Sequence, residues 1–153
     1  MKKQYVIVAF LRLQSEPIFK RTSWPLHLTI LGPFFTNHEF MVLADKMRAV
    51  CNEHKPMTLV GKERRKFGRR NDVPATTVER TPELHQLHTK LLERLSDTIE
   101  LKVLEHSGRN YAPHVSDRMT SKLKQGETIT LNSLSLVELL DDKGIIVANA
   151  ELI

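Results

Sequence analysis

The sequence has little of several features that each define a class of protein. It contains a single cysteine, Cys51, so no internal disulfide can form and a reducing, cytoplasmic location is expected. No apolar stretch approaches the roughly 20 residues needed to span a bilayer. A glycine-rich phosphate loop and a nucleotide-binding fingerprint are also missing. These absences argue against a disulfide scaffold, a membrane protein and a dinucleotide cofactor.

The apolar run near the N-terminus has only a superficial likeness to a signal peptide. It covers Tyr5–Leu11, is short and rich in β-branched residues, and is followed by Arg12 without a small-residue cleavage site. The run therefore predicts a buried strand.

Length and charge narrow the remaining classes of protein. The 153 residues suit one domain, residues 1–153, and a chain of this length buries about two-thirds of its unfolded surface without staples. The net charge of +5 favours anionic partners, nucleic acid included. We expect a monomer that does not bind membranes and needs no metal or other cofactor.

The hydrophobic pattern predicts an α+β protein with two helices and about seven or eight strands. One helix is expected to start at a capping box, Thr36 to Glu39, and to end near Glu53. The other has Thr81 as its N-cap and a leucine stripe. The strands are expected at about 4–12, 26–31 (ended by Gly32-Pro33), 57–67, 73–79, 99–105, 111–118, 128–139 and 145–152.

Two short segments have the form histidine, apolar residue, hydroxyl residue. They are His27-Leu28-Thr29 and His114-Val115-Ser116. On a strand, side chains alternate between the two faces, so each segment presents an imidazole and a hydroxyl side by side. An imidazole exchanges protons near neutral pH, and a hydroxyl can donate a hydrogen bond to a phosphate oxygen. Two facing units could therefore hold a phosphodiester between a general acid and a general base.

Chance alone also produces such triplets. With seven histidines, and Ser or Thr at about one position in eight, roughly one is expected. Three features favour function over chance. Both triplets lie in strand-like apolar alternation, both closely follow a proline, and they lie in opposite halves of the chain.

The combination of motifs resembles the 2H phosphoesterase superfamily, in particular the bacterial RNA 2′,3′-cyclic phosphodiesterases, also called 2′-5′ RNA ligases. The resemblance covers nearly the whole chain in element order. The stretches that carry it, besides the two triplets, are Leu31-Gly32-Pro33-Phe34, Tyr111-Ala112-Pro113-His114 and Thr81-Pro82-Glu83-Leu84.

The resemblance implies a bilobal, pseudo-symmetric fold, in which two antiparallel sheets form a concave cleft and the helices lie outside. It implies catalysis by His27 and His114, phosphate binding by Thr29 and Ser116, and hydrolysis of 2′,3′-cyclic or 2′-5′ phosphodiesters of RNA or nucleotides. It further implies that His27 is the acid and His114 the base. The sequence departs from the family pattern at Ser116, where Thr is commoner, and at Asp117, which puts a negative charge near an anionic cleft.

Other residues are candidates for substrate contacts. Arg118 lies two residues beyond Ser116 and on the same strand face. Tyr111 opens the second motif, and Trp24 and Phe34 flank the first; for Phe34, core packing is the alternative. Phe67 lies in a basic run, residues 62–70, that is either a phosphate-binding rim or a solvated hairpin tip.

Two further readings stay open. His85 and His88 are three residues apart on a predicted helix, but no ligand set completes a metal site, and we interpret them as the flank of a packed face. A nucleic-acid-binding module of the same fold, with little turnover, is the alternative function. The sequence separates neither hydrolysis from ligation nor release of a 2′-phosphate from release of a 3′-phosphate.

Overall fold

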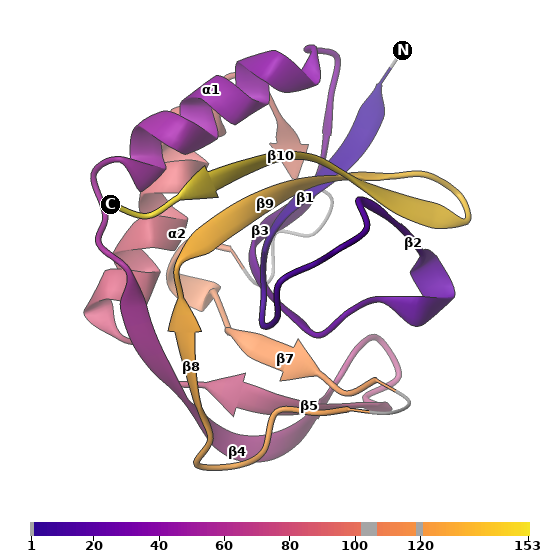
Figure 1. The fold of residues 1–153 in the computed structure, drawn as a ribbon, viewed down its shortest axis with the longest axis vertical. Coiled ribbons are helices and arrows are strands. Elements are labelled where there is room, and N and C mark those ends of the chain that lie inside the picture. Colours follow the sequence, from indigo (N-terminus) through magenta and orange to yellow (C-terminus); the bar gives the residue numbers. More distant parts are fainter. Residues whose placement is uncertain (1, 102–106, 119–120) are drawn as a thin grey trace.

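The computed structural model describes residues 2–101, 107–118 and 121–153. These residues form ten strands, all paired antiparallel in two sheets, and two α-helices. Figure 1 shows the large sheet in the upper half and the small sheet in the lower half, with both helices on one outer side. The predicted α+β fold of two sheets with external helices is therefore confirmed. In the described part of the chain, neither helix has the length and apolarity required to cross a membrane.

The large sheet has the strand order β2-β10-β9-β1-β3-β6, and the small sheet the order β7-β5-β4-β8. The two predicted motif strands thus belong to different sheets. The strands of the large sheet are β1 (Lys3–Phe10), β2 (Ile18–Lys20), β3 (His27–Thr36), β6 (Glu100–Leu101), β9 (Ser133–Leu139) and β10 (Lys143–Glu151). Those of the small sheet are β4 (Met57–Phe67), β5 (Val73–Val78), β7 (His114–Ser116) and β8 (Thr128–Leu131).

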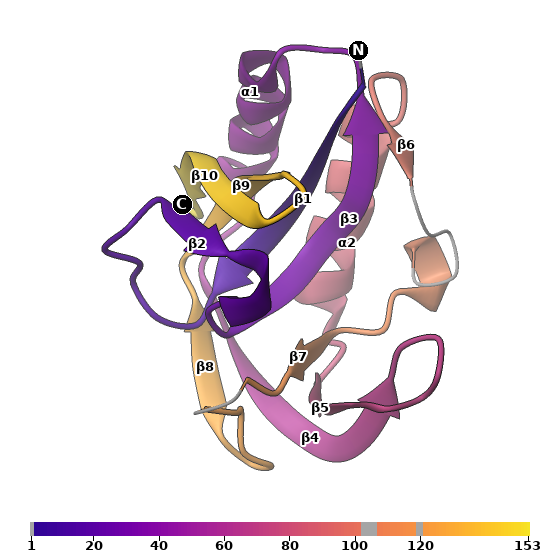
Figure 2. The ribbon, with the colours of Figure 1, turned by 90° about the vertical axis from the view of Figure 1, so that its right-hand side faces the viewer.

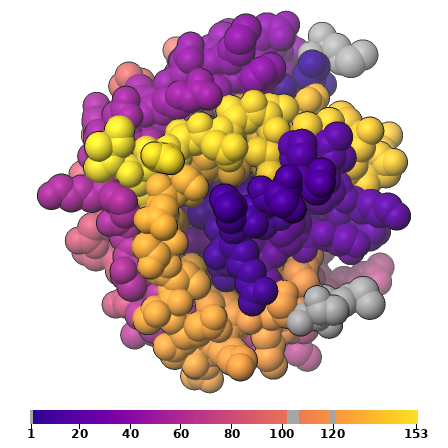
Figure 3. Space-filling model, viewed as in Figure 1, coloured from indigo at the N-terminus to yellow at the C-terminus, as the bar shows by residue number. Residues whose placement is uncertain are grey.

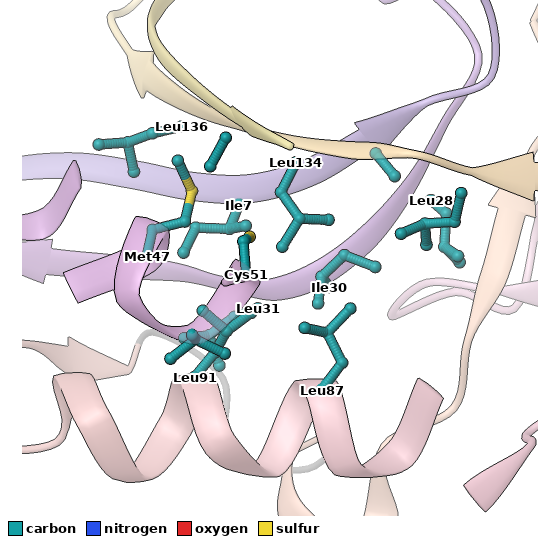
Figure 4. Packing of buried hydrophobic residues seen from close by; sticks show 14 of the residues in the cluster. Ile7, Leu28, Ile30, Leu31, Met47, Cys51, Leu87, Leu91, Leu134 and Leu136 are labelled. Atoms are coloured by element: carbon teal, nitrogen blue, oxygen red, sulfur yellow. The ribbon is translucent and has the colours of Figure 1, made fainter. Parts of the chain in front are cut away.

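The helices are α1 (Phe40–Cys51) and α2 (Pro82–Leu95), and short 3-10 turns cover Arg21–Ser23 and Gly108–Asn110. Helix α1 contacts β9 and β10, and α2 contacts β3 (Figure 2). Between them and the sheet lies the main core. Figure 4 shows Ile7, Leu28, Ile30 and Leu31 of the sheet facing Met47 and Cys51 of α1 and Leu87 and Leu91 of α2.

The opposite face of the large sheet carries a second, smaller apolar cluster. Val6, Val8, Val137 and Leu139 form its buried centre, and Phe10, Phe19, Trp24 and Ile146 pack around them. Because side chains alternate along a strand, the residues paired with this cluster share its face. His27 is paired with Phe10 and Thr29 with Val8, so the first motif points away from the helices.

The sequence predicted that this strand ends at Gly32-Pro33, but β3 continues past both residues. Val6 of β1 lies opposite both residues in a bulge, and β3 continues to Thr36. Gly32 has φ +113°, and a Cβ there would lie 3.3 Å from the Cα of Val6. The glycine is thus required by the bulge, which keeps the strand in the sheet instead of ending it.

Other boundaries also differ. The predicted capping box is wrong: Thr36 is the last residue of β3, and its hydroxyl donates to the Thr98 carbonyl at 2.7 Å. Helix α1 instead starts at Phe40, with no side-chain cap at Glu39.

The expected strand 128–139 is divided between the two sheets at Asn132, and β2 was not predicted. Residues 102–105 of the expected strand 99–105 lie outside the described residues. The Thr81 cap is confirmed, because its hydroxyl accepts from the Leu84 N–H at 3.1 Å.

Candidate functional site

The two motif strands come together although they lie in opposite halves of the chain. Strands β3 and β7 contact each other, and the Tyr111 hydroxyl, just before β7, donates to the Thr29 carbonyl at 2.8 Å. A pocket of about 230 Å³ has Thr29 and His114 in its wall. The two sheets thus bring the motif strands together, as the family resemblance implied.

The two imidazoles are held in the same local arrangement. Nδ1 of His27 lies 2.9 Å from the Pro25 carbonyl, and Nδ1 of His114 lies 2.8 Å from the Ala112 carbonyl. A carbonyl only accepts, so Nδ1 carries the proton in both rings. This contact fixes the tautomer and makes Nε2 the nitrogen suited to taking or giving a proton.

Aromatic rings hold each imidazole. Trp24 packs on His27 with ring centres 4.3 Å apart, and Phe10 meets the same ring edge-on at 6.3 Å. Phe67 stacks almost parallel on His114, with ring centres 3.8 Å apart and planes 7° apart. Trp24 and Phe67 therefore contact the imidazoles directly. The orientation of each imidazole is fixed by one carbonyl and one aromatic neighbour.

Burial and charge lower the pKa of His27 to about 4. Desolvation is the largest cause, the Pro25 carbonyl opposes it, and the positive charges of Arg118 and His114 lower the pKa further. Both charged residues therefore lie close enough to act on His27. At neutral pH the His27 imidazole is therefore uncharged, with its Nε2 able to accept a proton.

Arg118 carries a charge that the described residues do not balance. Its Nε is buried and has no hydrogen-bond partner in the described parts of the chain, and burial lowers the pKa of the guanidinium. A half-buried guanidinium without a carboxylate partner among the described residues is the arrangement expected of an anion-binding group.

Asp117, by contrast, does not bring a free negative charge to the cleft. Arg64 binds its carboxylate through two hydrogen bonds of 2.7 and 2.6 Å and also donates to the Thr76 hydroxyl at 2.8 Å. The Arg64 guanidinium holds the pKa of Asp117 below its usual range. The departure from the family pattern at Asp117 is thus compensated by a cation from β4.

The remaining predicted residues are placed as follows. Phe34 is fully buried beside Tyr5, with ring centres 6.4 Å apart, so it packs in the core and is closed to ligands. Tyr111 is also buried, and its hydroxyl donates its hydrogen bond to the Thr29 carbonyl. In the basic run, Arg64 is paired, and the Arg65 guanidinium lies 5.8 Å from the Phe67 ring centre.

His85 and His88 do not form a metal site, because both ring nitrogens of His88 have protein partners. His85 instead faces Arg80, whose guanidinium lies 3.0 Å from its Nδ1. In the part of the chain that the structure describes, no group of three His, Cys, Asp or Glu side chains is placed to hold a metal ion.

Sequence reasoning missed Phe10 and Phe19, which complete the aromatic surface around Trp24 and His27. Phe10 is paired with His27 across β1 and β3, so only the strand register would have revealed it. Phe10 also lines a wider pocket of about 640 Å³, between residues 10–14 and 130–135. This hollow separates the indigo N-terminal segment from the orange strands in Figure 3.

Comparison with known proteins places the chain in a family. The sequence model of the 2'-5' RNA ligase superfamily matches residues 10–132. Solved structures with the same fold include E. coli LigT complexed with 3'-AMP, at 12% identity, TM-score 0.61 and 99% coverage of both chains. They also include the protein TT0787 of Thermus thermophilus, at 13% identity, TM-score 0.59 and 97% coverage of both chains. No curated protein sequence matches the chain significantly.

Proposed function

Because the chain belongs to the 2'-5' RNA ligase superfamily, we propose that it is a metal-independent phosphodiesterase acting through His27 and His114. Membership supports phosphodiester chemistry in general. The proposed substrates are 2′,3′-cyclic phosphates or 2′-5′ linkages of RNA ends or small nucleotides, and the proposed setting is a monomer in the cytoplasm. The observation that carries the proposal is the matched pair of imidazoles. Each has its Nδ1 on a carbonyl two residues earlier and its ring against an aromatic side chain.

In the proposed reaction, one imidazole takes a proton from water as the water oxygen bonds to phosphorus. The other gives a proton to the ribose oxygen as its bond to phosphorus breaks. The lowered pKa of His27 makes it neutral at pH 7 and suits it to the base role, with His114 as the acid. This assignment reverses the one implied by resemblance, because an acid with a pKa of about 4 would be almost fully deprotonated at neutral pH.

The hydroxyls and the cation act on the phosphate. Thr29 and Ser116 lie two residues beyond their histidines on the same strand faces, so their hydroxyls can donate to the non-bridging oxygens. The Arg118 charge balances the phosphate. These three groups favour the transition state because the phosphoryl oxygens gain charge there.

Turnover in chelator is the test of the proposed chemistry. With EDTA present, we expect hydrolysis of at least one of four substrates: 2′,3′-cyclic nucleotides, RNA with a cyclic phosphate end, a 2′-5′ dinucleotide and ADP-ribose cyclic phosphate. Activity lost in EDTA and restored by a divalent ion would contradict the metal-independent mechanism. Tight RNA binding without turnover of any substrate would instead support the binding-module alternative.

The stacking of Phe67 on His114 gives a second prediction. Removing the ring in Phe67→Leu should lower kcat by roughly 2- to 12-fold, because aromatic pairs contribute about 0.5–1.5 kcal/mol beyond burial. Phe67→Tyr keeps the stacked ring and serves as the matched control. Steady-state kinetics of both variants test this role, and equal kcat in Phe67→Leu and wild type would show that the stacking does not position His114.

A further inference from the structure

A third histidine, His88 on α2, forms hydrogen bonds with backbone groups near both motifs. Its side chain is buried, with 1% of its surface exposed. Nδ1 donates to the Ile30 carbonyl of β3 at 2.7 Å, and Nε2 accepts from the Gly108 N–H at 2.9 Å. One ring therefore binds the first motif strand on one side and the segment leading to the second motif on the other.

Tyr111 extends this connection. Its ring lies parallel to His88, with ring centres 4.1 Å and planes 4° apart, and its hydroxyl donates to the Thr29 carbonyl. Two consecutive carbonyls of β3, those of Thr29 and Ile30, are thus bound by the stacked pair His88 and Tyr111. Tyr111 is only three residues before His114, so this pair fixes the backbone beside both catalytic strands.

The hydrogen bonds of His88 require a neutral ring, because a protonated Nε2 could not accept from Gly108. Burial is the main cause of a lowered pKa for His88; the hydrogen bond to the Ile30 carbonyl opposes it, and the electrostatic effects of His85 and Arg80 lower the pKa further. The protein environment thus supports the form that the two contacts need.

We propose that His88 is a positioning residue that, with Tyr111, sets the place of His114 relative to His27 and Thr29. The inference rests on the proposed two-histidine reaction for its kinetic consequence, but its structural content is independent of turnover. Misplacement of a reacting group by about 1 Å can cost on the order of 100-fold in rate, although no substrate contact is lost. His88 therefore acts on the rate through geometry, without touching the substrate.

Three variants separate the two hydrogen bonds. His88→Phe keeps a ring to stack on Tyr111 and loses both bonds. His88→Asn can keep the donor to Ile30, and His88→Gln can keep the acceptor for Gly108. We expect His88→Phe to lower kcat by about 10- to 100-fold with little change in KM, and the two amide variants to retain more activity. His54→Gln is the control, because the His54 ring binds only the Val50 carbonyl among the described residues.

Hydrogen exchange of the Gly108 amide gives a readout that needs no substrate. The amide should be protected in wild type and His88→Gln, and should exchange faster in His88→Phe and His88→Asn. Wild-type kcat in His88→Phe, or a Gly108 amide equally protected in all four proteins, would overturn the proposal. If the wild type hydrolyses none of the substrates, the proposed function fails while the exchange result still decides the structural connection. If His88→Phe does not fold, the difference between His88→Gln and His88→Asn decides both readouts.

Discussion

Replacing either motif histidine by alanine is expected to lower kcat by about 10²–10⁴-fold, because general acid and general base catalysis each contribute that much. His27→Ala removes the proposed base and His114→Ala the proposed acid. Neither loss can be covered by the other ring, since in the proposed reaction the two act on opposite sides of the phosphorus. Thr29→Ala and Ser116→Ala should lose less, roughly 10- to 100-fold, because each removes one hydrogen bond to a charged group.

Steady-state kinetics with thermal unfolding of each variant test this prediction. Both histidine variants should remain folded, because neither side chain belongs to the main core and both keep some solvent exposure. His54→Ala provides the control for removing an imidazole elsewhere. Near-wild-type turnover of the true substrate by either His27→Ala or His114→Ala would refute the paired mechanism.

Arg118→Met should lower kcat/KM by roughly 10- to 150-fold. Hydrogen bonds to charged groups contribute about 1.5–3 kcal/mol, and the positive charge of this guanidinium acts on His27. The variant should not unfold more easily than wild type, because it removes a half-buried charge whose Nε has no partner among the described residues. It should also raise the pKa of His27, whose value Arg118 lowers.

The matched control is Arg69→Met, on the exposed part of the basic hairpin. It should change kcat/KM by far less than Arg118→Met, and mainly through salt-dependent attraction of an anionic substrate. NMR titration of His27 in both variants measures the expected pKa change. An Arg118→Met enzyme with wild-type kcat/KM and an unchanged His27 pKa would remove Arg118 from the site.

The sequence pattern located those elements whose signal is local. The strand predicted at 57–67 and the cap and leucine stripe of α2 agree with the structure, because each signal depends on neighbouring residues. Thr36 was misread because its hydroxyl binds the carbonyl of Thr98, far along the chain, instead of capping a helix. The break of 128–139 into β8 and β9 depends on which sheet each half joins, and no local pattern encodes that choice.

The same distinction applies to the candidate site. Period-two alternation placed His27 with Thr29, and His114 with Ser116, on shared faces. It gave no information on the ring of Phe67 against His114, which needs the β4–β5 hairpin to reach β7. The role of His88 was equally hidden, because its two partners lie 58 and 20 residues away in the sequence.

The central claim is that two imidazoles, one neutral and one protonated, act on one phosphodiester without a metal ion. The most direct measurement is kcat/KM for a 2′,3′-cyclic nucleotide against pH, in EDTA, for wild type and the His27→Ala and His114→Ala variants. This ratio reports the protonation states of the free enzyme. We predict a bell-shaped profile with its acidic limb near the His27 pKa of about 4. That limb should be flattened in His27→Ala, and the alkaline limb in His114→Ala. A wild-type profile without either limb, or one whose limbs both persist in the two variants, would contradict the account.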